Sequence, residues 1–237
     1  MKRVLAFGLL VLLSCSGVEE EQLKPRITTV FASFKSEQDT QWVFVDTIYD
    51  LDKPVEDTIN AGLSGATVML VGPDTVLFSE AQDRPGRYFA RVQILPETTY
   101  TLFVQSPLGD SYTLSSRSPK AFEMLLPSNG DSIAPDSLWI TWTDPGNPEY
   151  GLRIFLLDST AQDTEQSDFG REIFFPLYPN GDTSTQQVPA ALFWLMGAFN
   201  TDYLLQAMAY DTVNTGRDDY HDFTVFWTSS CTVFIKE

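Results

Sequence analysis

Alternation of apolar and polar side chains with a period of two is the feature that most restricts the fold of this chain. The stretch GRYFARVQI, residues 86–94, sets Tyr88, Ala90, Val92 and Ile94 at alternate positions. Successive side chains of a β-strand point to opposite faces, so this strand can bury one face and leave the other in water. The same period recurs from Ile27 onward, and it predicts an all-β protein.

Seven strands are expected in the first half of the chain, each bounded by Gly, Pro, Asn or Asp residues. They span residues 27–34, 40–49, 65–71, 75–80, 86–94, 99–106 and 110–116. The connections VGPDT and PLGDS carry the residues of tight reverse turns, and they predict antiparallel hairpins. Residues 50–65 are polar and without a period, so they are expected to form a long surface loop.

The alternation breaks around residues 118–121, in a stretch rich in proline and turn residues that predicts a domain junction. Beyond it, strands are expected in SLWITWTDPG, YGLRIFLLDS, NTDYLLQAMAYD and SSCTVFI. One short helix is expected in VPAALFWLMGAF, where Pro189 suits the first turn and Gly197 suits the end. The expected domains therefore cover residues 27–118 and 119–237.

The N-terminus has the layout of a secretory signal followed by a lipid attachment site. Lys2 and Arg3 precede an apolar core over residues 4–13. A bilayer span needs about 20 apolar residues, so the core predicts a signal peptide. The stretch LLSC that follows resembles the lipobox of bacterial lipoproteins, which implies cleavage before Cys15 and a diacylglycerol on its sulfur. An ordinary signal peptide with an incidental cysteine is the alternative.

A short acidic segment links the expected lipid to the folded part. With residues 1–14 removed as signal peptide, residues 15–26 form a tether that begins at lipidated Cys15. At about 3.5 Å per extended residue, the tether reaches roughly 40 Å from the bilayer. By resemblance to known sorting rules, Ser16 implies an outer-membrane lipoprotein that faces the periplasm or the outside. The run GVEEEQ is either a solvated spacer or a signal for export to the cell surface.

The charge balance restricts the partners of the chain. It has 15 basic and 32 acidic residues, a formal net charge of −17. Such a surface repels the phosphate backbone, which argues against nucleic acid as a partner. It also disfavours contact with anionic lipid headgroups. Membrane association is therefore expected through the lipid on Cys15.

Three short motifs in the first half resemble those of a known group of β-sandwich domains. They are GATVML at 65–70, PGRY at 85–88 and PETTYTL at 96–102. These motifs resemble the carboxypeptidase-regulatory-like and related immunoglobulin-like domains, many of which have glycine where this chain has Glu97 and Thr98. Together with the lipobox, the first half is similar to a family of bacterial surface lipoproteins known as domain of unknown function 4249. The resemblance implies a location and a fold, and it brings no activity with it.

The second half resembles a fibronectin type III domain over residues 120–237. Trp142 stands where that family keeps a core tryptophan, and LMGAFNTDYLLQAMAYD is similar to the stretch that leads to a tyrosine on its sixth strand. The resemblance implies that Tyr203 forms the tyrosine corner. Residues 212–230 make a longer connection into the last strand than is usual. The fold predicted overall is two immunoglobulin-like antiparallel β-sandwich domains after a lipoprotein signal peptide.

The sequence offers little for catalysis. Its one histidine, His221, lies in GRDDYHDF beside Asp218, Asp219 and Asp222. An envelope hydrolase that uses His221 with these acids is the alternative function. The cluster lacks the ligand spacing of a zinc or calcium site, and no G-x-S-x-G or glycine-rich phosphate motif occurs. We therefore expect no enzyme activity, no metal and no cofactor.

The second cysteine, Cys231, is expected to be structural. Alternation in SSCTVFI puts it on one face with Val233 and Ile235, which predicts a buried thiol. A reactive surface thiol is the alternative, and it would need a base or cation nearby. With Cys15 committed to lipid, no disulfide is expected.

Most aromatic residues, which make up 13% of the chain, are expected in the core. Trp42, Phe44 and Trp142 lie on predicted strands and are assigned there. Trp139 has the opposite parity to Trp142, so it is expected to face outward.

A few aromatic residues lie in less regular segments and provide the functional hypothesis. They are Phe174, Phe175, Tyr178 and Trp194. An exposed patch of such rings can hold a sugar or a partner protein, whereas the alternative is that they cover the open end of the core. The sequence therefore predicts a lipid-anchored cell-envelope protein that acts as a non-catalytic binding or scaffolding module for a protein or glycan.

Overall fold

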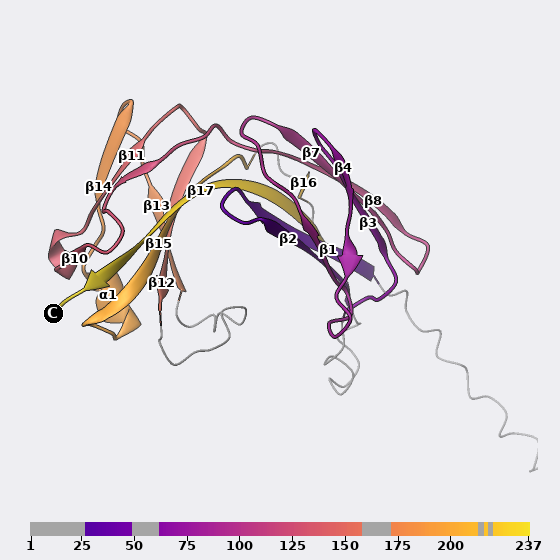
Figure 1. Ribbon diagram of the computed structural model, residues 1–237, viewed down its shortest axis with the longest axis horizontal. Coiled ribbons are helices and arrows are strands. Elements are labelled where there is room, and N and C mark those ends of the chain that lie inside the picture. The colour runs from indigo at the N-terminus through magenta and orange to yellow at the C-terminus, as the bar shows by residue number, and fades with distance from the viewer. Residues whose placement is uncertain (1–26, 49–61, 158–171, 213–215, 218–219) are drawn as a thin grey trace, which may run out of the picture.

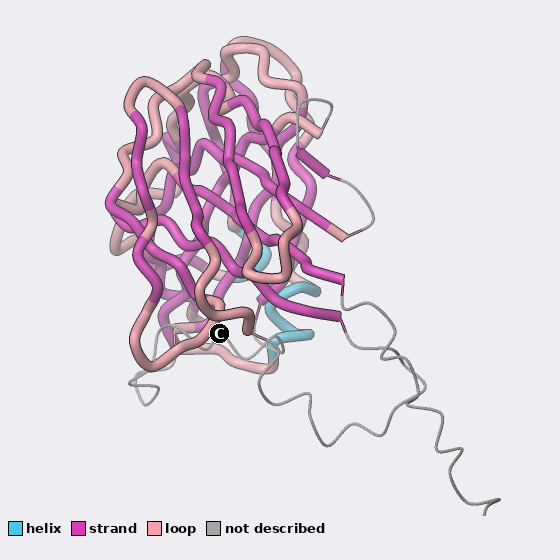
Figure 2. Tube along the Cα trace, turned by 90° about the vertical axis from the view of Figure 1, so that its right-hand side faces the viewer, coloured by secondary structure: helices cyan, strands magenta, loops and turns pink. Residues whose placement is uncertain are grey.

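The computed structural model describes residues 27–48, 62–157, 172–212, 216–217 and 220–237, and it is built almost entirely of strands. Figure 1 shows two β-sandwiches connected by one long strand, and Figure 2 shows the helical segments gathered toward one end. The predicted all-β sandwich fold is confirmed. Among the residues described, no helix has the length and apolar character needed to cross a bilayer. The signal peptide and tether, residues 1–26, lie outside the described residues, as does most of the loop predicted at 50–65.

The first sandwich takes eight strands from the first half of the chain. They are β1 (Ile27–Lys35), β2 (Thr40–Ile48), β3 (Thr67–Val71), β4 (Thr75–Leu77), β5 (Ser79–Glu80), β6 (Arg87–Arg91), β7 (Thr99–Gln105) and β8 (Ser111–Arg117). A four-stranded antiparallel sheet, β4-β3-β7-β8, covers one side of the core. The other side belongs to a ten-stranded sheet that runs through both sandwiches. The two predicted hairpins are confirmed as β3–β4 and β7–β8.

The second sandwich takes its strands from the second half. They are β9 (Met124–Leu126), β10 (Ser132–Ile133), β11 (Trp139–Thr143), β12 (Glu149–Leu156), β13 (Glu172–Leu177), β14 (Thr183–Gln187), β15 (Thr201–Tyr210) and the second part of β17 (His221–Ile235), with a 3-10 turn at Pro135–Ser137 and the helix α1 (Ala191–Met196). The short strand β16 (Gly216–Arg217) instead pairs with Phe223 and Asp222 of β17, beside the first sandwich. The sheet β14-β11-β9 packs over the strands β13, β12, β15 and β17 of the ten-stranded sheet.

The last strand, β17, belongs to both sandwiches. The ten-stranded sheet has the order β13-β12-β15-β17-β1-β2-β6-β5, with β10 and β16 also paired to β17. Residues 221–226 of β17 pair in parallel with β1, and residues 227–235 pair antiparallel with β15. Phe223 and Val225 are therefore buried in the first core, although the predicted boundary assigns everything after residue 118 to the second domain.

Burial follows the predicted alternation in both cores. Tyr88, Ala90, Val92 and Ile94 are buried in the first core, as are Phe34 and Leu102. Trp142 is fully buried in the second core, where it lies 6.0 Å from the ring of Tyr150. Trp139 is 49% exposed, so its predicted outward orientation is confirmed.

The tyrosine corner implied by the fibronectin type III resemblance is present. The hydroxyl of Tyr203 donates a hydrogen bond of 2.6 Å to the carbonyl of Ala198, five residues upstream. The predicted short helix is also confirmed. It ends at Gly197, whose φ of 67° is left-handed and whose N–H donates to the carbonyls of Phe193 and Trp194.

The strands β9, β10, β13, β14 and β16, and the start of β17, lie outside the stretches where the sequence predicts strands. Residues 172–177, EIFFPL, form β13, which pairs with β12 as an edge strand and so tolerates Pro176. The predicted long connection at 212–230 contains the first half of β17. Glu97 has a φ of 54°, and it takes the left-handed conformation where the related domains carry glycine.

Candidate binding surface

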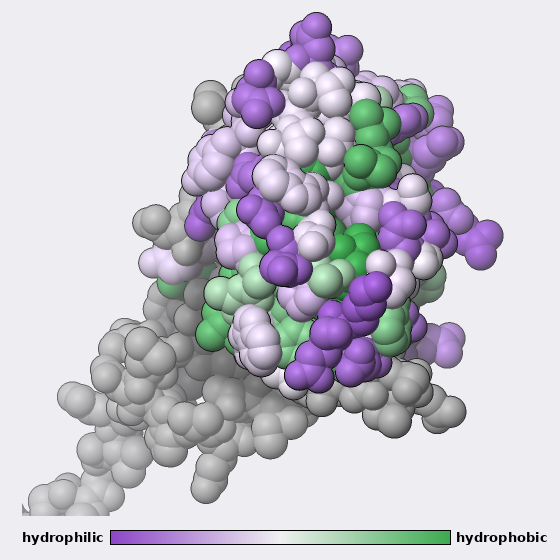
Figure 3. Space-filling model, turned by 90° about the vertical axis from the view of Figure 1, so that its left-hand side faces the viewer, coloured by the Kyte–Doolittle hydropathy of each residue, from purple (hydrophilic) through white to green (hydrophobic). Residues whose placement is uncertain are grey.

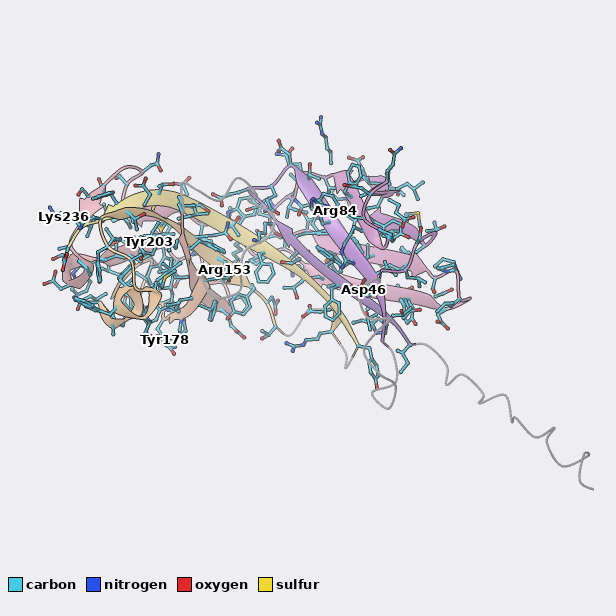
Figure 4. All side chains as sticks on the ribbon, turned by 90° about the horizontal axis from the view of Figure 1, so that it is seen from below. Asp46, Arg84, Arg153, Tyr178, Tyr203 and Lys236 are labelled. Atoms are coloured by element: carbon cyan, nitrogen blue, oxygen red, sulfur yellow. The ribbon has the colours of Figure 1, made fainter. Side chains whose placement is uncertain are left out.

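One face of the ten-stranded sheet packs on the two cores, and its opposite face is turned outward. In β17 the odd-numbered residues Phe223, Val225, Cys231, Val233 and Ile235 enter the cores, so the even-numbered residues lie on the outer face. Figure 4 looks onto this outer face, with Asp46 on β2 and Arg153 on β12. The sheet itself is continuous from β13 to β5 and spans both sandwiches, while Gln206, Met208 and Thr228 on this face of β15 and β17 are buried.

Four aromatic side chains of β1, β2 and β6 gather on the outer face, and we call them the aromatic cluster: Phe31, Trp42, Phe44 and Phe89. Phe31 is opposite Phe44, and Trp42 is opposite Phe89, in the strand register. The rings of Trp42 and Phe89 are 5.2 Å apart at a tilt of 39°. Phe31, Phe44 and Phe89 are 48%, 38% and 37% exposed, and Trp42 is half-buried. The cluster therefore offers ring surface to a ligand from a fixed sheet.

Arg87 joins the aromatic cluster to a carboxylate. Its guanidinium carbon lies 4.7 Å from the centre of the Phe44 ring, a cation–π arrangement. Its Nη1 donates a hydrogen bond of 2.7 Å to Oδ1 of Asp46. Both side chains remain partly exposed, so donors and acceptors border the rings.

A second group of side chains lies on the outer face of the second sandwich. Arg153 of β12 is hydrogen-bonded and ion-paired to Glu172 of β13, and its guanidinium lies 5.1 Å from the Phe155 ring. Burial, and then the positive charge of Arg153, lower the pKa of Lys35 from its usual value. Lys35 stands at the end of β1, opposite Phe226 of β17. Two cations, Lys35 and Arg153, therefore lie close enough to repel each other near the middle of the sheet, and the carboxylates of Glu172 and Glu37 partly offset that repulsion.

The structure does not bring the four predicted binding residues into one patch. Phe174 and Phe175 follow each other on β13, so they point to opposite faces. Phe174 is half exposed on the outer face and lies over Gly151, where a Cβ would come within 2.3 Å of the ring. Phe175 packs against the second core, as expected from the alternative that these rings cover the open end of the core. Tyr178 and Trp194 are exposed, and Trp194 contacts Phe199 at 4.5 Å between ring centroids.

The end of the second sandwich shows no single apolar surface. Figure 3 views this end and shows small hydrophobic areas interrupted by hydrophilic side chains. Trp194 and Leu195 of α1 are exposed there, but a six-residue helix presents few side chains. The outer face of the ten-stranded sheet is the more extended candidate.

The aromatic cluster corrects one prediction from the sequence. Trp42 and Phe44 were expected in the core, but the core side of β2 is made by Val43 and Val45. The stretch QWVFV is apolar on both faces, so alternation alone does not say which face is buried. The smaller valines fill the interior, and the larger rings face outward with Phe31 and Phe89. A strand apolar on both faces was the signal that pointed to this surface.

The two described members of the predicted cluster, His221 and Asp222, do not face each other. Its side chain is buried against Tyr112, with ring centroids 4.2 Å apart. Asp222 is the next residue of β17 and points to the opposite face, where it accepts a hydrogen bond from Thr224. Asp218 and Asp219 lie outside the described residues. The described residues hold no group of three His, Cys, Asp or Glu side chains suited to a metal ion.

Cys231 is buried in the second core beside Val233 and Ile235, as predicted. Burial, and then the charges of Asp131 and Glu37, raise the pKa of its thiol to about 11. The reactive thiolate is therefore scarce at neutral pH, which favours the structural role.

Comparisons with known proteins add little to this geometry. No family model matches the chain, and no curated protein matches it. Among solved structures, the chain is similar to fibronectin(III)-like modules of CbhA from Clostridium thermocellum, at 14% identity and a TM-score of 0.23, over 89% of this chain and 94% of that one. A putative membrane anchored protein from Corynebacterium diphtheriae has 8% identity and a TM-score of 0.22, over 88% and 59% of the two chains.

The third similar structure is SGBP-B of a Bacteroides ovatus mixed-linkage glucan utilization locus, in complex with a mixed-linkage heptasaccharide. It has 11% identity and a TM-score of 0.22, over 89% of this chain and 61% of that one. TM-scores this low carry no functional argument, so the function is argued from the chain's own surface.

Proposed function

We propose that this chain is a lipid-anchored protein of the cell envelope that acts as a non-catalytic binding module for a protein or glycan partner. The observation that carries the proposal is the aromatic cluster on the outer face of β1, β2 and β6. Large rings exposed together on a rigid sheet bury much area at little cost in conformational entropy when a ligand binds. His221 is buried and Asp222 points to the opposite face of β17, so these two residues do not form a joint site for the hydrolase alternative.

The proposed location is the outer membrane, with the folded part in the periplasm or outside the cell. It rests on the signal peptide and lipobox of residues 1–15, and on a tether that leads directly into β1 at Ile27. Two or three acyl chains at Cys15 anchor a protein stably, because each buried methylene contributes about 0.8 kcal/mol.

Replacing Cys15 with serine is expected to abolish lipidation and release the protein from the membrane. Cells fed labelled palmitate should incorporate label into the wild-type chain and none into Cys15→Ser, which should move to the soluble fraction. Cys231→Ser is the matched control, since it removes the other thiol and should keep both label and membrane location. Unchanged labelling in Cys15→Ser would show that the lipobox assignment is wrong.

The binding role is tested with the chain immobilised and exposed to solubilised cell envelope, with both protein and polysaccharide detected among the retained material. We expect a specific component to be retained, and to be lost in the double variant Phe31→Ser, Phe44→Ser, because both rings leave the outer face. Trp139→Ala is the matched control, since Trp139 is exposed on the other sheet of the second sandwich. Retention of nothing, or equal retention by the double variant, would contradict the proposal.

A further inference from the structure

The aromatic cluster has a geometry that suits flat, weakly polar ligand faces. Trp42 and Phe89 come from adjacent strands and tilt toward each other, while Phe44 lies beside them under Arg87. The face of an aromatic ring carries partial negative charge, and it attracts the partially positive C–H groups that line the face of a sugar ring. Several rings side by side can therefore stack on successive sugars of one chain.

The polar groups that border the rings complement hydroxyls. Arg87 has N–H donors that Asp46 does not occupy, and Asp46 has a second carboxylate oxygen. A hydroxyl group both donates and accepts, so neighbouring hydroxyls of one sugar can bond to the two side chains together. Because Arg87 and Asp46 are already paired, the site gains no net charge from them, and it favours a neutral ligand over an ion.

Other occupants fit this surface less well. The rings are only partly exposed and alternate with polar side chains such as Ser33 and Asp46, whereas membrane insertion needs protruding apolar groups. The chain's net charge of −17 also opposes anionic lipids. The core of a protein interface is depleted in charged residues, while here an ion pair lies among the rings.

We propose that the outer face of β1, β2 and β6 binds a neutral polysaccharide. Trp42, Phe44 and Phe89 stack on its sugar rings, and the Arg87–Asp46 pair bonds to its hydroxyls. The inference rests on the proposed binding function and names the class of ligand and the site.

The test uses the full mature chain with Cys15→Ser, so that lipid does not interfere. Affinity electrophoresis is run in gels that contain a neutral polysaccharide, which is mixed-linkage β-glucan, xyloglucan or glucomannan. A gel with polygalacturonate provides the comparison with an acidic polysaccharide. Calorimetry then measures the affinity for each polysaccharide that retards the protein. We expect at least one neutral polysaccharide to bind, and binding to weaken roughly tenfold in Trp42→Ala and in Phe89→Ala, as loss of one stacked ring implies. Trp139→Ala should bind like the wild type.

Two further variants separate a lost contact from a lost fold. Phe89→Thr keeps a residue that favours strands on β6, and Asp46→Asn keeps the shape of the side chain while it unpairs Arg87. Both should keep the wild-type circular dichroism spectrum and bind more weakly. Binding by polygalacturonate alone, binding unchanged in Trp42→Ala and Phe89→Thr, or no binding to any of the neutral polysaccharides would overturn this inference. If the immobilised chain nevertheless retains an envelope protein, the wider proposal of a binding module is still supported, and only the polysaccharide inference fails.

Discussion

A fragment that contains only residues 27–118 is expected not to fold, although the sequence marks it as a complete domain. The fragment lacks residues 221–226 of β17, which pair along the whole second half of β1. It also loses Phe223 and Val225 from its core, and Phe223 packs edge-to-face on Phe34 at 5.1 Å. Burying two such side chains contributes about 3–6 kcal/mol, a large share of the 5–15 kcal/mol that stabilises an ordinary domain.

Circular dichroism and the dispersion of amide proton signals measure the outcome directly. A matched fragment in which residues 220–228 follow residue 118 through a flexible glycine-serine linker should regain a cooperative urea transition. It restores the contact of Val225, whose N–H donates a hydrogen bond of 3.0 Å to Ser116 Oγ. A well-folded 27–118 fragment without the added strand would show that β17 is dispensable to the first sandwich.

The shared strand has a consequence for how the two sandwiches behave together. β17 continues without interruption from the first core, at Phe223, to the second core, at Ile235. Residues 221–226 are hydrogen-bonded to β1 and residues 227–235 to β15, so the two sandwiches can come apart only if β17 leaves one of them, which would break that ladder. The outer face that carries the aromatic cluster is thus held on one continuous sheet, and a ligand bound there does not have to order two loosely linked domains.

Much of this fold could be predicted because alternation is a local property. Residues 86–94 show which side chains of β6 are buried, and the turn residues of PLGDS place the β7–β8 hairpin. The tyrosine corner at Tyr203, on β15 after the short helix, was implied by the resemblance of the stretch around it to a fibronectin type III domain. Each of these features depends on residues close together in the chain.

What the sequence did not reveal depends on contacts between distant residues. The parallel pairing of β1 with β17 joins Val30 to His221, and no local pattern indicates it. The outward orientation of Trp42 follows from the choice of Val43 and Val45 for the core, which is decided by the opposite sheet. The binding surface was therefore expected on irregular segments around Phe174 and Trp194, while the aromatic cluster lies on the three regular strands β1, β2 and β6.

Replacing Gly86 with alanine is expected to destabilise the first sandwich by about 2–5 kcal/mol. Gly86 has a φ of 73°, where a side chain adds roughly 1–2 kcal/mol of strain. A Cβ there would also lie 2.4 Å from the carbonyl oxygen of Val45 and 2.5 Å from the nitrogen of Leu63. Both atoms belong to the backbone and cannot turn aside, and forcing extra volume into such packing costs about 1–3 kcal/mol more.

Gly109→Ala is the matched control for this change. Gly109 also has a left-handed φ, 99°, but an added Cβ would meet no atom within 4 Å, so only the strain of about 1–2 kcal/mol applies. Urea unfolding of the two variants should therefore separate the backbone collision at Gly86 from conformational strain. Gly86 accepts from the Val45 N–H and directly precedes Arg87, so the same substitution should also move Arg87 from Phe44 and weaken ligand binding. Equal losses of stability in the two variants would mean that the backbone around Gly86 yields, and that the glycine is required only for its φ.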